Sequence, residues 1–490
     1  MLKILNTLTR KKEEFKPINE KEVSFYHCGP TVYWVQHIGN MRAMVMADLI
    51  SRSLKYLGYN VKLVRNYTDV GHLTGDNDEG EDKLAKGAKR ENKTPQEIAD
   101  EYIEVFESDL RDLNVADPQV KPRATEHIKE MIEMIEILLD KNYAYSTDLA
   151  VYFDVSKAKD YTRLSGQKLE ENIQSAGKGS VNDKNKKSPS DFALWFFKAG
   201  VHKNALQTWK SPFQSGLVKN GEGFPGWHIE CSVMSKKYLG DTLDVHMGGV
   251  EHIPVHHTNE IAQSESANGV KFVNYWLHNE HLTVNNGKMA KSEGTSYSVS
   301  DIKEKGFDPL VLRYLFLNAH YRSKQNFTWE ALESAEKSLS RLRDKVLEIH
   351  GEIPLPPLTK GGTKEIELAG APLCEGGQGD SYKQKFVSAI EDDFNVPQAL
   401  AVIWELVKLA SVDNSVKLEL ILEFDKVLGL NLANIENQKI EISDKIQKLV
   451  EERNEARANS DWKKADEIRD RIKGLGFVLE DSSGKTIIKK

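Results

Sequence analysis

Apolar and polar positions at the start of the chain change period twice. Residues 23–28, VSFYHC, form a short β-branched and aromatic run that predicts a buried strand. From Met41 to Tyr56 apolar residues recur at helical spacing, until Gly58 provides a stop. A second strand is predicted at 61–66, VKLVRN. The order strand, helix, strand predicts a parallel sheet.

This alternation is interrupted and later resumes. Residues 82–115 and 124–141 have the pattern of amphipathic helices, and residues 116–224 are interpreted mainly as an insertion that contains a polar loop at 177–191. Strand and helix patterns return afterwards, with strands at 243–247 and 270–277 and a helix at 258–267. We therefore predict an α/β fold, a Rossmann-like parallel-sheet domain split in two by a connective insertion.

The last third of the chain is predicted to be all-α. Residues 351–379 contain four prolines and seven glycines without an apolar period, which indicates a linker or an irregular insertion. Packed helices are predicted at 386–410 and 418–430. At the end, Ala465, Ile468, Ile472 and Leu475 share one helical face opposite an earlier helix at 442–450, which predicts a small helical hairpin module.

Composition narrows the class of protein. A chain of 490 residues with 39% apolar content is expected to form about two to four domains. It has neither a secretory apolar segment nor about 18 consecutive apolar residues, so we expect a cytoplasmic protein without a membrane partner. The net charge of −7 gives no global signal for nucleic acid, so any RNA contact must be local. Three cysteines, Cys28, Cys231 and Cys374, are too few for a disulfide framework and fit a reducing compartment.

Two loops carry candidate phosphate chemistry. His37, in the segment HIGN, lies at the N-terminus of the first predicted helix, where unpaired N–H groups and the helix dipole favour a polyphosphate. In GKMAKS, Lys288 and Lys291 can both reach a pyrophosphate leaving group, and the preceding strand-like stretch places this loop at a sheet edge. The alternatives are a turn histidine and a solvated basic turn.

A possible metal-binding pair follows the third predicted strand, at 243–247. His256 and Glu260 are four residues apart, so on a helix they project from one face and could share an ion. A surface contact is the common alternative. No CxxC motif is present, so the sequence alone does not group the cysteines with this pair.

Four ordered motifs carry a family resemblance. YHCGPTVY, FPGWHIECS, HHTNEIAQS and KMAKS resemble those of cysteinyl-tRNA synthetases, and HIGN and KMAKS resemble the two signatures of class I aminoacyl-tRNA synthetases. The similarity extends over nearly the whole chain. It implies ATP-dependent formation of cysteinyl adenylate and transfer of cysteine to the 3′ end of tRNA(Cys). His37, Lys288 and Lys291 would be catalytic, and ATP would be bound by Thr31, His37, Asn40, Lys288 and Lys291.

The resemblance also implies a zinc site. Cys28 and Cys231 join His256 and Glu260 as ligands of one Zn²⁺ ion, a donor set that zinc favours. The ion would bind the substrate sulfur as thiolate and so reject serine. An apolar pocket alone discriminates between near-isosteres, such as cysteine and serine, by only about 10- to 200-fold. No editing domain is then needed. The amino-acid pocket is expected to contain Gly29, Thr68, Trp227 and His246, with His257 in the same polar wall.

Domains and partners follow from the same resemblance. The resemblance implies L-cysteine, tRNA(Cys) and ATP with Mg²⁺ as partners, and a monomeric protein. Two alternative functions remain. One is a cysteine ligase for a small amino-sugar acceptor, but such an enzyme would not need the C-terminal modules. The other is a non-catalytic RNA-binding paralogue, but the lysines and the proposed metal ligands are intact. The expected domains are a first catalytic half (1–115), a connective insertion (116–224), a second catalytic half (225–300), a stem-contact helical region (301–350), a linker (351–380), a tRNA-binding helical bundle (381–432) and a small anticodon-binding domain (437–490).

Several positions depart from the family pattern. Asn40 stands where the first signature has its last histidine, and Ala290 stands where the second has serine. Thr258 replaces a frequent glutamate, Glu251 and His252 replace an Asp-Leu pair, and the 70–85 loop is divergent. Asparagine keeps hydrogen-bonding capacity, so nucleotide binding is expected to survive.

Overall fold

The computed structural model consists of two compact units, Met1–Leu430 and Asn431–Lys490, which are described separately. No helix among the described residues has the length and apolar character needed to cross a membrane. The structure describes residues 1–70, 83–167, 183–287, 289, 294–351, 378–434, 444–459, 461–474, 478–482 and 485–489.

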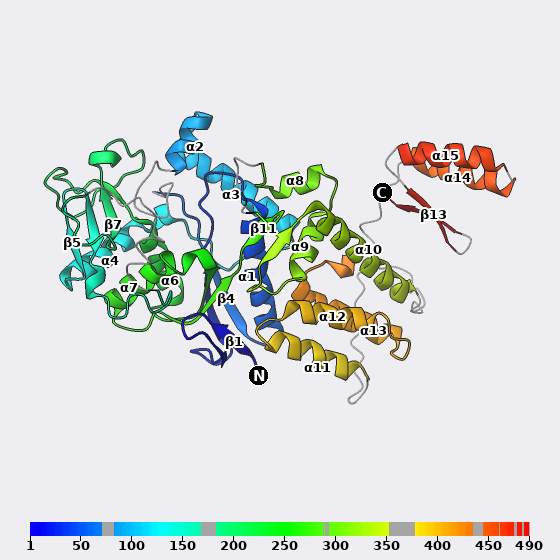
Figure 1. Ribbon diagram of the computed structural model, residues 1–490, viewed down its shortest axis with the longest axis horizontal. Helices are drawn as coiled ribbons and strands as arrows, with labels where there is room; N and C mark the ends of the chain where they lie inside the picture. The colour runs from blue at the N-terminus through cyan, green and yellow to red at the C-terminus, as the bar shows by residue number, and fades with distance from the viewer. Residues whose placement is uncertain are drawn as a thin grey trace, which may run out of the picture. The chain divides into compact units, whose positions relative to one another are not determined.

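A four-stranded parallel sheet forms the centre of the first unit (Figure 1). Its strands are β3 (Glu22–His27), β4 (Asn60–Arg65), β9 (Leu243–Gly249) and β10 (Val273–Asn279), in the order β10-β9-β3-β4. The chain leaves β3 towards one edge and leaves β9 towards the other. The carboxyl ends of β3 and β9 therefore flank a topological switch point, where open α/β sheets bind ligands.

Three helices each lead directly into a strand of this sheet. In α1 (Ile38–Tyr56), the apolar positions predicted from the sequence are buried, and His37 is the N-cap. The other two are α6 (Trp227–Leu239) and α7 (His256–Asn268), which end at Gly240 and Gly269, both with positive φ. The predicted strands and helices of both half-sheets are confirmed, as is the split α/β fold.

Between β4 and α6 lies a segment with its own antiparallel sheet of order β5-β6-β7-β8. Its apolar side packs against α4, α6 and α7 in one continuous core, which fixes the two helices that carry the site. The single helical stretch predicted at 82–115 is two helices, because Asn92 adopts a positive φ and Thr94 starts the second with a capping box. The elements are α2 (Lys83–Glu91), α3 (Pro95–Asp112), η1 (Ala124–His127), α4 (Ile128–Asp140), β5 (Ala144–Ser146), β6 (Ala150–Phe153), η2 (Val155–Lys157), β7 (Phe192–Phe197), η3 (Gly200–His202) and β8 (Gly223–Pro225).

Helices dominate the chain after the parallel sheet, and two small sheets complete the unit. β1 (Lys3–Asn6) pairs with β2 (Lys11–Glu14), and β11 (Leu282–Val284) pairs with β12 (Gln325–Phe327). The remaining elements are η4 (Val250–His252), α8 (Val299–Glu304), α9 (Pro309–Leu317), α10 (Trp329–Gly351), α11 (Gln378–Glu391), α12 (Val396–Leu406) and α13 (Asn414–Leu428).

Two fully buried arginines fasten α1 to this helical region. Arg42 donates hydrogen bonds to the carbonyl oxygens of His320 and Ser323. Arg313 of α9 donates to Asp48 Oδ2 at 2.7 Å and to the carbonyl oxygen of Leu428 at 2.7 Å. A buried guanidinium needs several partners, so these contacts hold the signature helix at a defined position against α9 and α13.

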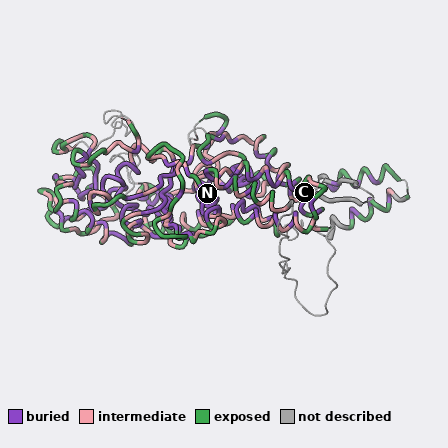
Figure 2. The backbone as a smooth tube through the Cα atoms, turned by 90° about the horizontal axis from the view of Figure 1, so that it is seen from below, coloured by how far each residue is buried: buried purple, intermediate pink, exposed green. Residues whose placement is uncertain are grey.

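The second unit pairs two helices with a β-hairpin. Helices α14 (Asp444–Ala458) and α15 (Trp462–Gly474) form the predicted helical pair, and exposed and buried positions interchange along both in Figure 2. The hairpin of β13 (Val478–Ser482) and β14 (Lys485–Lys489) was not predicted. The small core consists of Leu449, Val450, Ile468, Ile472 and Leu479, whereas Ile442 and Leu475 lie outside the described residues.

Candidate active site

The four predicted zinc ligands meet at the switch point of the sheet. Cys28 follows β3 directly, Cys231 lies in α6, and His256 and Glu260 lie one turn apart in α7. One donor atom from each lies within 4.8 Å of the donor atoms of the other three, and all four residues are buried. Three segments separated by up to about 230 residues of sequence thus converge on one point because α6 packs against both β3 and α7.

Two of these donor atoms face each other without a hydrogen bond. His256 Nε2 and Glu260 Oε1 are 2.9 Å apart. Within the described part of the chain, neither atom has a hydrogen-bond partner of good geometry, although both are buried. The two atoms form a buried ion pair instead, and together with the thiols of Cys28 and Cys231 they bring nitrogen, oxygen and sulfur donors to one point, as in a site that holds an ion.

Electrostatics favour the metal-binding forms of Cys231 and Glu260. The hydrogen bond from Cys28 lowers the pKa of Cys231 to about 6. Burial opposes ionisation of Glu260, but His246 and His256 together bring its pKa down to about 2. Burial likewise opposes the charge on His256, and Glu260 outweighs it, so the pKa of His256 is raised to about 10. Burial raises the pKa of the Cys28 thiol. A bound cation would replace the protons that Cys28 and His256 retain.

Contacts from behind fix the orientation of His256. Its Nδ1 is 2.9 Å from Nδ1 of His228, with which it shares a hydrogen bond. The indole ring of Trp227 stacks on the imidazole with ring centroids 4.2 Å apart. With one nitrogen engaged and the ring plane fixed, the other nitrogen is directed to the ion site.

The residues predicted to line the amino-acid pocket lie next to the four proposed metal ligands. The N–H of Gly29 donates to Asn66 Oδ1, and a Cβ at Gly29 would lie only 1.6 Å from the carbonyl oxygen of Asn66, so a larger residue does not fit. Thr68 donates its hydroxyl to Glu230 Oε2 at 2.8 Å, next to Cys231 in α6. Burial and the charge of Cys231 raise the pKa of Glu230 well above its usual range. His246 of β9 donates to Glu260 Oε2 at 2.9 Å.

On the other side of Cys28, the first signature loop leads into α1. His37 Nδ1 accepts a hydrogen bond from the N–H of Asn40 at 3.2 Å, and the side-chain amide of Asn40 donates to Gln36 Oε1. Gln36 in turn donates to the carbonyl oxygen of Thr31, whose backbone lies in a parallel bridge with Thr68. Asn40, at the position where the family signature has a histidine, is therefore hydrogen-bonded within the loop and helps to hold its conformation.

The second signature loop touches the first through Met289. A Cβ at Gly39 would lie 2.2 Å from Met289 Cε, so the methionine packs directly against the start of α1. Lys288 and Lys291, like residues 71–82 of the divergent loop, lie outside the described residues. Among the other departures, Thr258 donates to the carbonyl oxygen of Ile253.

Three residues at the site were not predicted from the sequence. Glu230, His228 and Asn66 are buried and bonded to predicted site residues. His228 lies three residues before Cys231 on α6, so helical spacing was a usable signal for it. Asn66 gave no such signal, because its role depends on how β4 ends beside β3.

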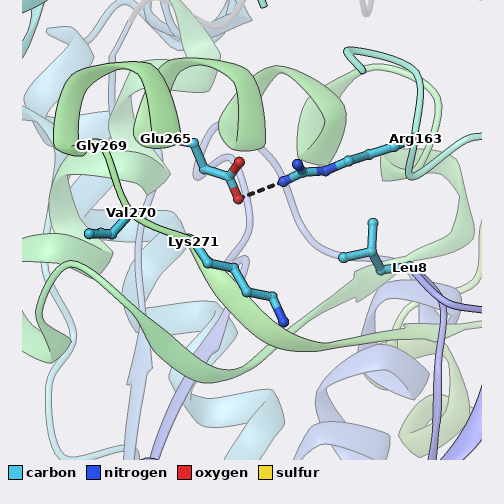
Figure 3. Close-up of a pocket in the computed structure, with 6 residues that line it drawn as sticks. All are labelled: Leu8, Arg163, Glu265, Gly269, Val270 and Lys271. Atoms are coloured by element: carbon cyan, nitrogen blue, oxygen red, sulfur yellow. Dashed lines mark hydrogen bonds and ion pairs between the residues drawn. The ribbon is translucent and has the colours of Figure 1, made fainter. Parts of the chain in front are cut away.

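A separate pocket of about 440 Å³ lies at the far end of α7 (Figure 3). Arg163 and Glu265 form an ion pair across it with N and O 2.5 Å apart. It contains none of the predicted site residues and is lined by Leu8, Arg163, Glu265, Gly269, Val270 and Lys271.

Family comparisons cover most of the chain. The catalytic domain of class I (C) tRNA synthetases matches residues 14–337, a DALR domain matches 385–433, and the cysteinyl-tRNA ligase anticodon-binding domain matches 440–487. Among solved structures, a methionyl-tRNA synthetase from Mycobacterium tuberculosis with methionyl-adenylate is similar in fold, with a TM-score of 0.56 and 14% identity over 85% of this chain and 93% of that one. A LeuRS ternary complex from Agrobacterium radiobacter has a TM-score of 0.57 and 10% identity, over 86% and 85%.

Curated relatives match from end to end. A cysteine–tRNA ligase from Treponema denticola is 43% identical over 100% of this chain and 99% of its own length. Cysteine–tRNA ligase 1 of Burkholderia lata is 42% identical, over 98% and 95%, and the enzyme of Clostridioides difficile is 40% identical, over 98% of both chains. The chain therefore belongs to the cysteine–tRNA ligase family of class I aminoacyl-tRNA synthetases.

Proposed function

We propose that this chain activates L-cysteine with ATP to cysteinyl adenylate and pyrophosphate, and then transfers the cysteinyl group to the 3′ end of tRNA(Cys). Family membership over the full length gives the reaction class. The observation that carries the choice of substrate is the buried group of Cys28, Cys231, His256 and Glu260 beside the helix N-terminus that bears His37. One side of the site suits phosphate, and the other suits a metal that selects sulfur.

The donor set fits Zn²⁺. Two thiols, an imidazole and a carboxylate make up the mixed sulfur, nitrogen and oxygen set that zinc prefers, and the facing atoms of His256 and Glu260 fit the same ion. Cys28, Cys231, His256 and Glu260 would hold it. When bound, zinc would supply affinity for a thiolate that a hydroxyl lacks, and so separate cysteine from serine.

The remaining residues position the reactants. Gly29, Thr68, Trp227 and His246 surround the amino acid, and the hydroxyl of Thr68 is held in place by Glu230. His37 presents the N-terminus of α1 to the ATP phosphates, supported by Thr31 and Asn40. Lys288 and Lys291 stabilise the charge that develops on the pyrophosphate, and Mg²⁺ accompanies ATP. Positioning and charge stabilisation suffice for an in-line attack on the α-phosphate, without a covalent enzyme intermediate.

The later modules bind the tRNA of a cytoplasmic monomer. We assign stem contacts to 301–350, body contacts to the bundle at 381–432, and anticodon reading to 437–490, with 1–115 and 225–300 as catalytic halves around the insertion at 116–224 and with 351–380 as linker. The DALR and anticodon-binding matches support the two last RNA contacts. In α15, Trp462 is 60% exposed next to Lys463 and Lys464, a combination suited to stacking on an unpaired base beside a phosphate.

A paired assay tests the proposal. Cysteine-dependent exchange of pyrophosphate into ATP separates a catalyst from an RNA-binding paralogue, and charging of a tRNA(Cys) transcript separates a tRNA ligase from a ligase for a small amino-sugar acceptor. We expect exchange with cysteine but not with serine, and charging of the transcript. Absence of exchange, or exchange without charging, would contradict the assignment.

A further inference from the structure

A second set of metal donors overlaps the first. Donor atoms of Cys28, His246, His257 and Glu260 also lie within 4.8 Å of one another, and all four residues are buried. This set shares Cys28 and Glu260 with the zinc site but replaces Cys231 and His256 by two other histidines. The shared residues are a thiol and a carboxylate, the two ligand types in this group that can bridge two metal ions.

The carboxylate of Glu260 already points one oxygen at each set. Its Oε1 lies 2.9 Å from Nε2 of His256, in the first set, and its Oε2 lies 2.9 Å from Nε2 of His246, in the second. A carboxylate with its two oxygens on different imidazoles has the geometry of a bridging ligand. The sulfur of Cys28 lies 3.4 Å from Nε2 of His257, so it also reaches the second set.

The histidines of the second set are fixed in the same way as His256. Nδ1 of His257 is hydrogen-bonded to Nε2 of His278 at 2.8 Å, and Nδ1 of His278 to the hydroxyl of Thr7 at 2.8 Å. Trp276 stacks on the ring of His246 with centroids 4.7 Å apart and an interplanar angle of 21°. In each set, therefore, one imidazole is hydrogen-bonded through the nitrogen that faces away from the ion, and one imidazole ring stacks on an indole. In the first set His256 has both supports, whereas in the second they are divided between His257 and His246.

Charge does not decide between one cation and two. Bound as thiolates and carboxylate, Cys28, Cys231 and Glu260 bring three negative charges into a site closed to solvent. One divalent ion leaves this buried group net negative, whereas a second reverses the sign. Buried net charge is costly in either case, so neither occupancy is excluded electrostatically and the donor geometry decides.

We propose that this chain binds a second divalent transition-metal ion, Zn²⁺ or Co²⁺, through His246 and His257, with Cys28 and Glu260 bridging it to the first ion. The inference rests on the proposed zinc site. Cys28 and Glu260 are occupied by the first ion, so the second binds with lower affinity, when metal is in excess. It withdraws His246 from the amino-acid pocket, and cysteine activation falls as the second site fills.

Stoichiometry measures the second site without reference to activity. Metal-free full-length protein is titrated with Co²⁺, the bound ion is counted by equilibrium dialysis, and the visible absorption of the cobalt complex is recorded. We expect two ions per chain. Electron paramagnetic resonance then distinguishes shared from separate ligands, because bridged Co²⁺ ions couple magnetically and give less signal than two isolated ions.

Variants assign each ion to its ligands. His257→Gln should bind one ion, lost in turn when Cys231→Ser is added, and Cys231→Ser alone should keep one. His202→Gln, a change at a buried histidine of the insertion, and Cys374→Ser should keep both. A wild-type protein that binds a single Co²⁺ dependent on Cys231 would overturn the second site and leave the proposed function intact. A single ion indifferent to Cys231 would overturn both, and a second ion that persists in His257→Gln, or two ions without magnetic coupling, would overturn the bridged arrangement.

Discussion

Replacing Gly39 with alanine should separate the two signature loops without harming the fold. The new Cβ would lie 2.2 Å from Met289 Cε and 3.0 Å from His37 Nδ1. Carbon atoms rest at about 3.5–4.0 Å, so the methionine must retreat by about 1.5 Å. Gly39 lies inside α1 and has no positive φ, and alanine is the better helix former by about 1 kcal/mol. The free energy of unfolding should therefore stay level or rise.

Activity should fall for the same reason. Met289 lies between the two lysines of its loop. The clash meets the terminal methyl group of its flexible side chain, so the lysines move relative to His37 as far as the backbone of Met289 follows. A misplacement of about 1 Å at a reacting centre can cost about 100-fold in rate. We expect kcat for cysteine-dependent pyrophosphate exchange to drop by about 10- to 100-fold in Gly39→Ala, with an unchanged urea unfolding curve.

A second substitution provides the control. Met289→Ala removes the atoms that clash with the new Cβ, so the double variant should recover most of the exchange rate that Gly39→Ala loses, measured against Met289→Ala alone. Full activity of Gly39→Ala would refute the contact between the loops. A double variant no faster than Gly39→Ala would show that the loss has another cause.

Three other changes test the site and its support. Thr68→Val removes the donor to buried Glu230 and should lower the free energy of unfolding by about 1–3 kcal/mol and raise KM for cysteine more than it lowers kcat; an unchanged KM would exclude Thr68 from the pocket. Arg313→Met removes one of the two arginines that pair with buried Asp48, while Arg52 remains, and should cost about 1.5–3 kcal/mol in urea unfolding; a loss below about 1 kcal/mol, as for a surface pair, would contradict this. Burial lowers the pKa of His202 to about 4, whereas an unfolded histidine titrates near 6.5, so acid protonates the unfolded chain first. Stability should be full above about pH 6.5 and fall by about 3 kcal/mol towards pH 4, and thermal melts of His202→Phe should lack this part of the decline.

Local periodicity was sufficient for the elements that build the sheet. The predictions at 23–28 and 41–56 correspond to β3 and α1. They succeeded because the apolar positions that set the period, such as Val45 and Leu49, are the positions that the structure buries. The prediction of a single helix at 82–115 missed the break, since Asn92 with its positive φ lies within an otherwise polar stretch. The C-terminal hairpin was not predicted, because each of its strands has only five residues and most of them are polar or charged.

Long-range contacts were beyond the reach of sequence patterns. Arg42 and Arg313 are fully buried, but arginine is usually exposed, and their partners lie more than 100 residues away. The resemblance to a known family named the four proposed zinc ligands, whereas the sequence alone gave only the pair His256 and Glu260. The role of His278 depends on β10 lying beside β9, which only the sheet order reveals.

We propose that zinc held by Cys28, Cys231, His256 and Glu260 selects cysteine by its sulfur. The most direct test is cysteine-dependent pyrophosphate exchange by metal-free protein, with circular dichroism as a measure of fold. We expect the metal-free protein to keep its helical signal, to lose exchange, and to regain it with one equivalent of Zn²⁺. Undiminished exchange by protein shown to contain no metal would contradict the account.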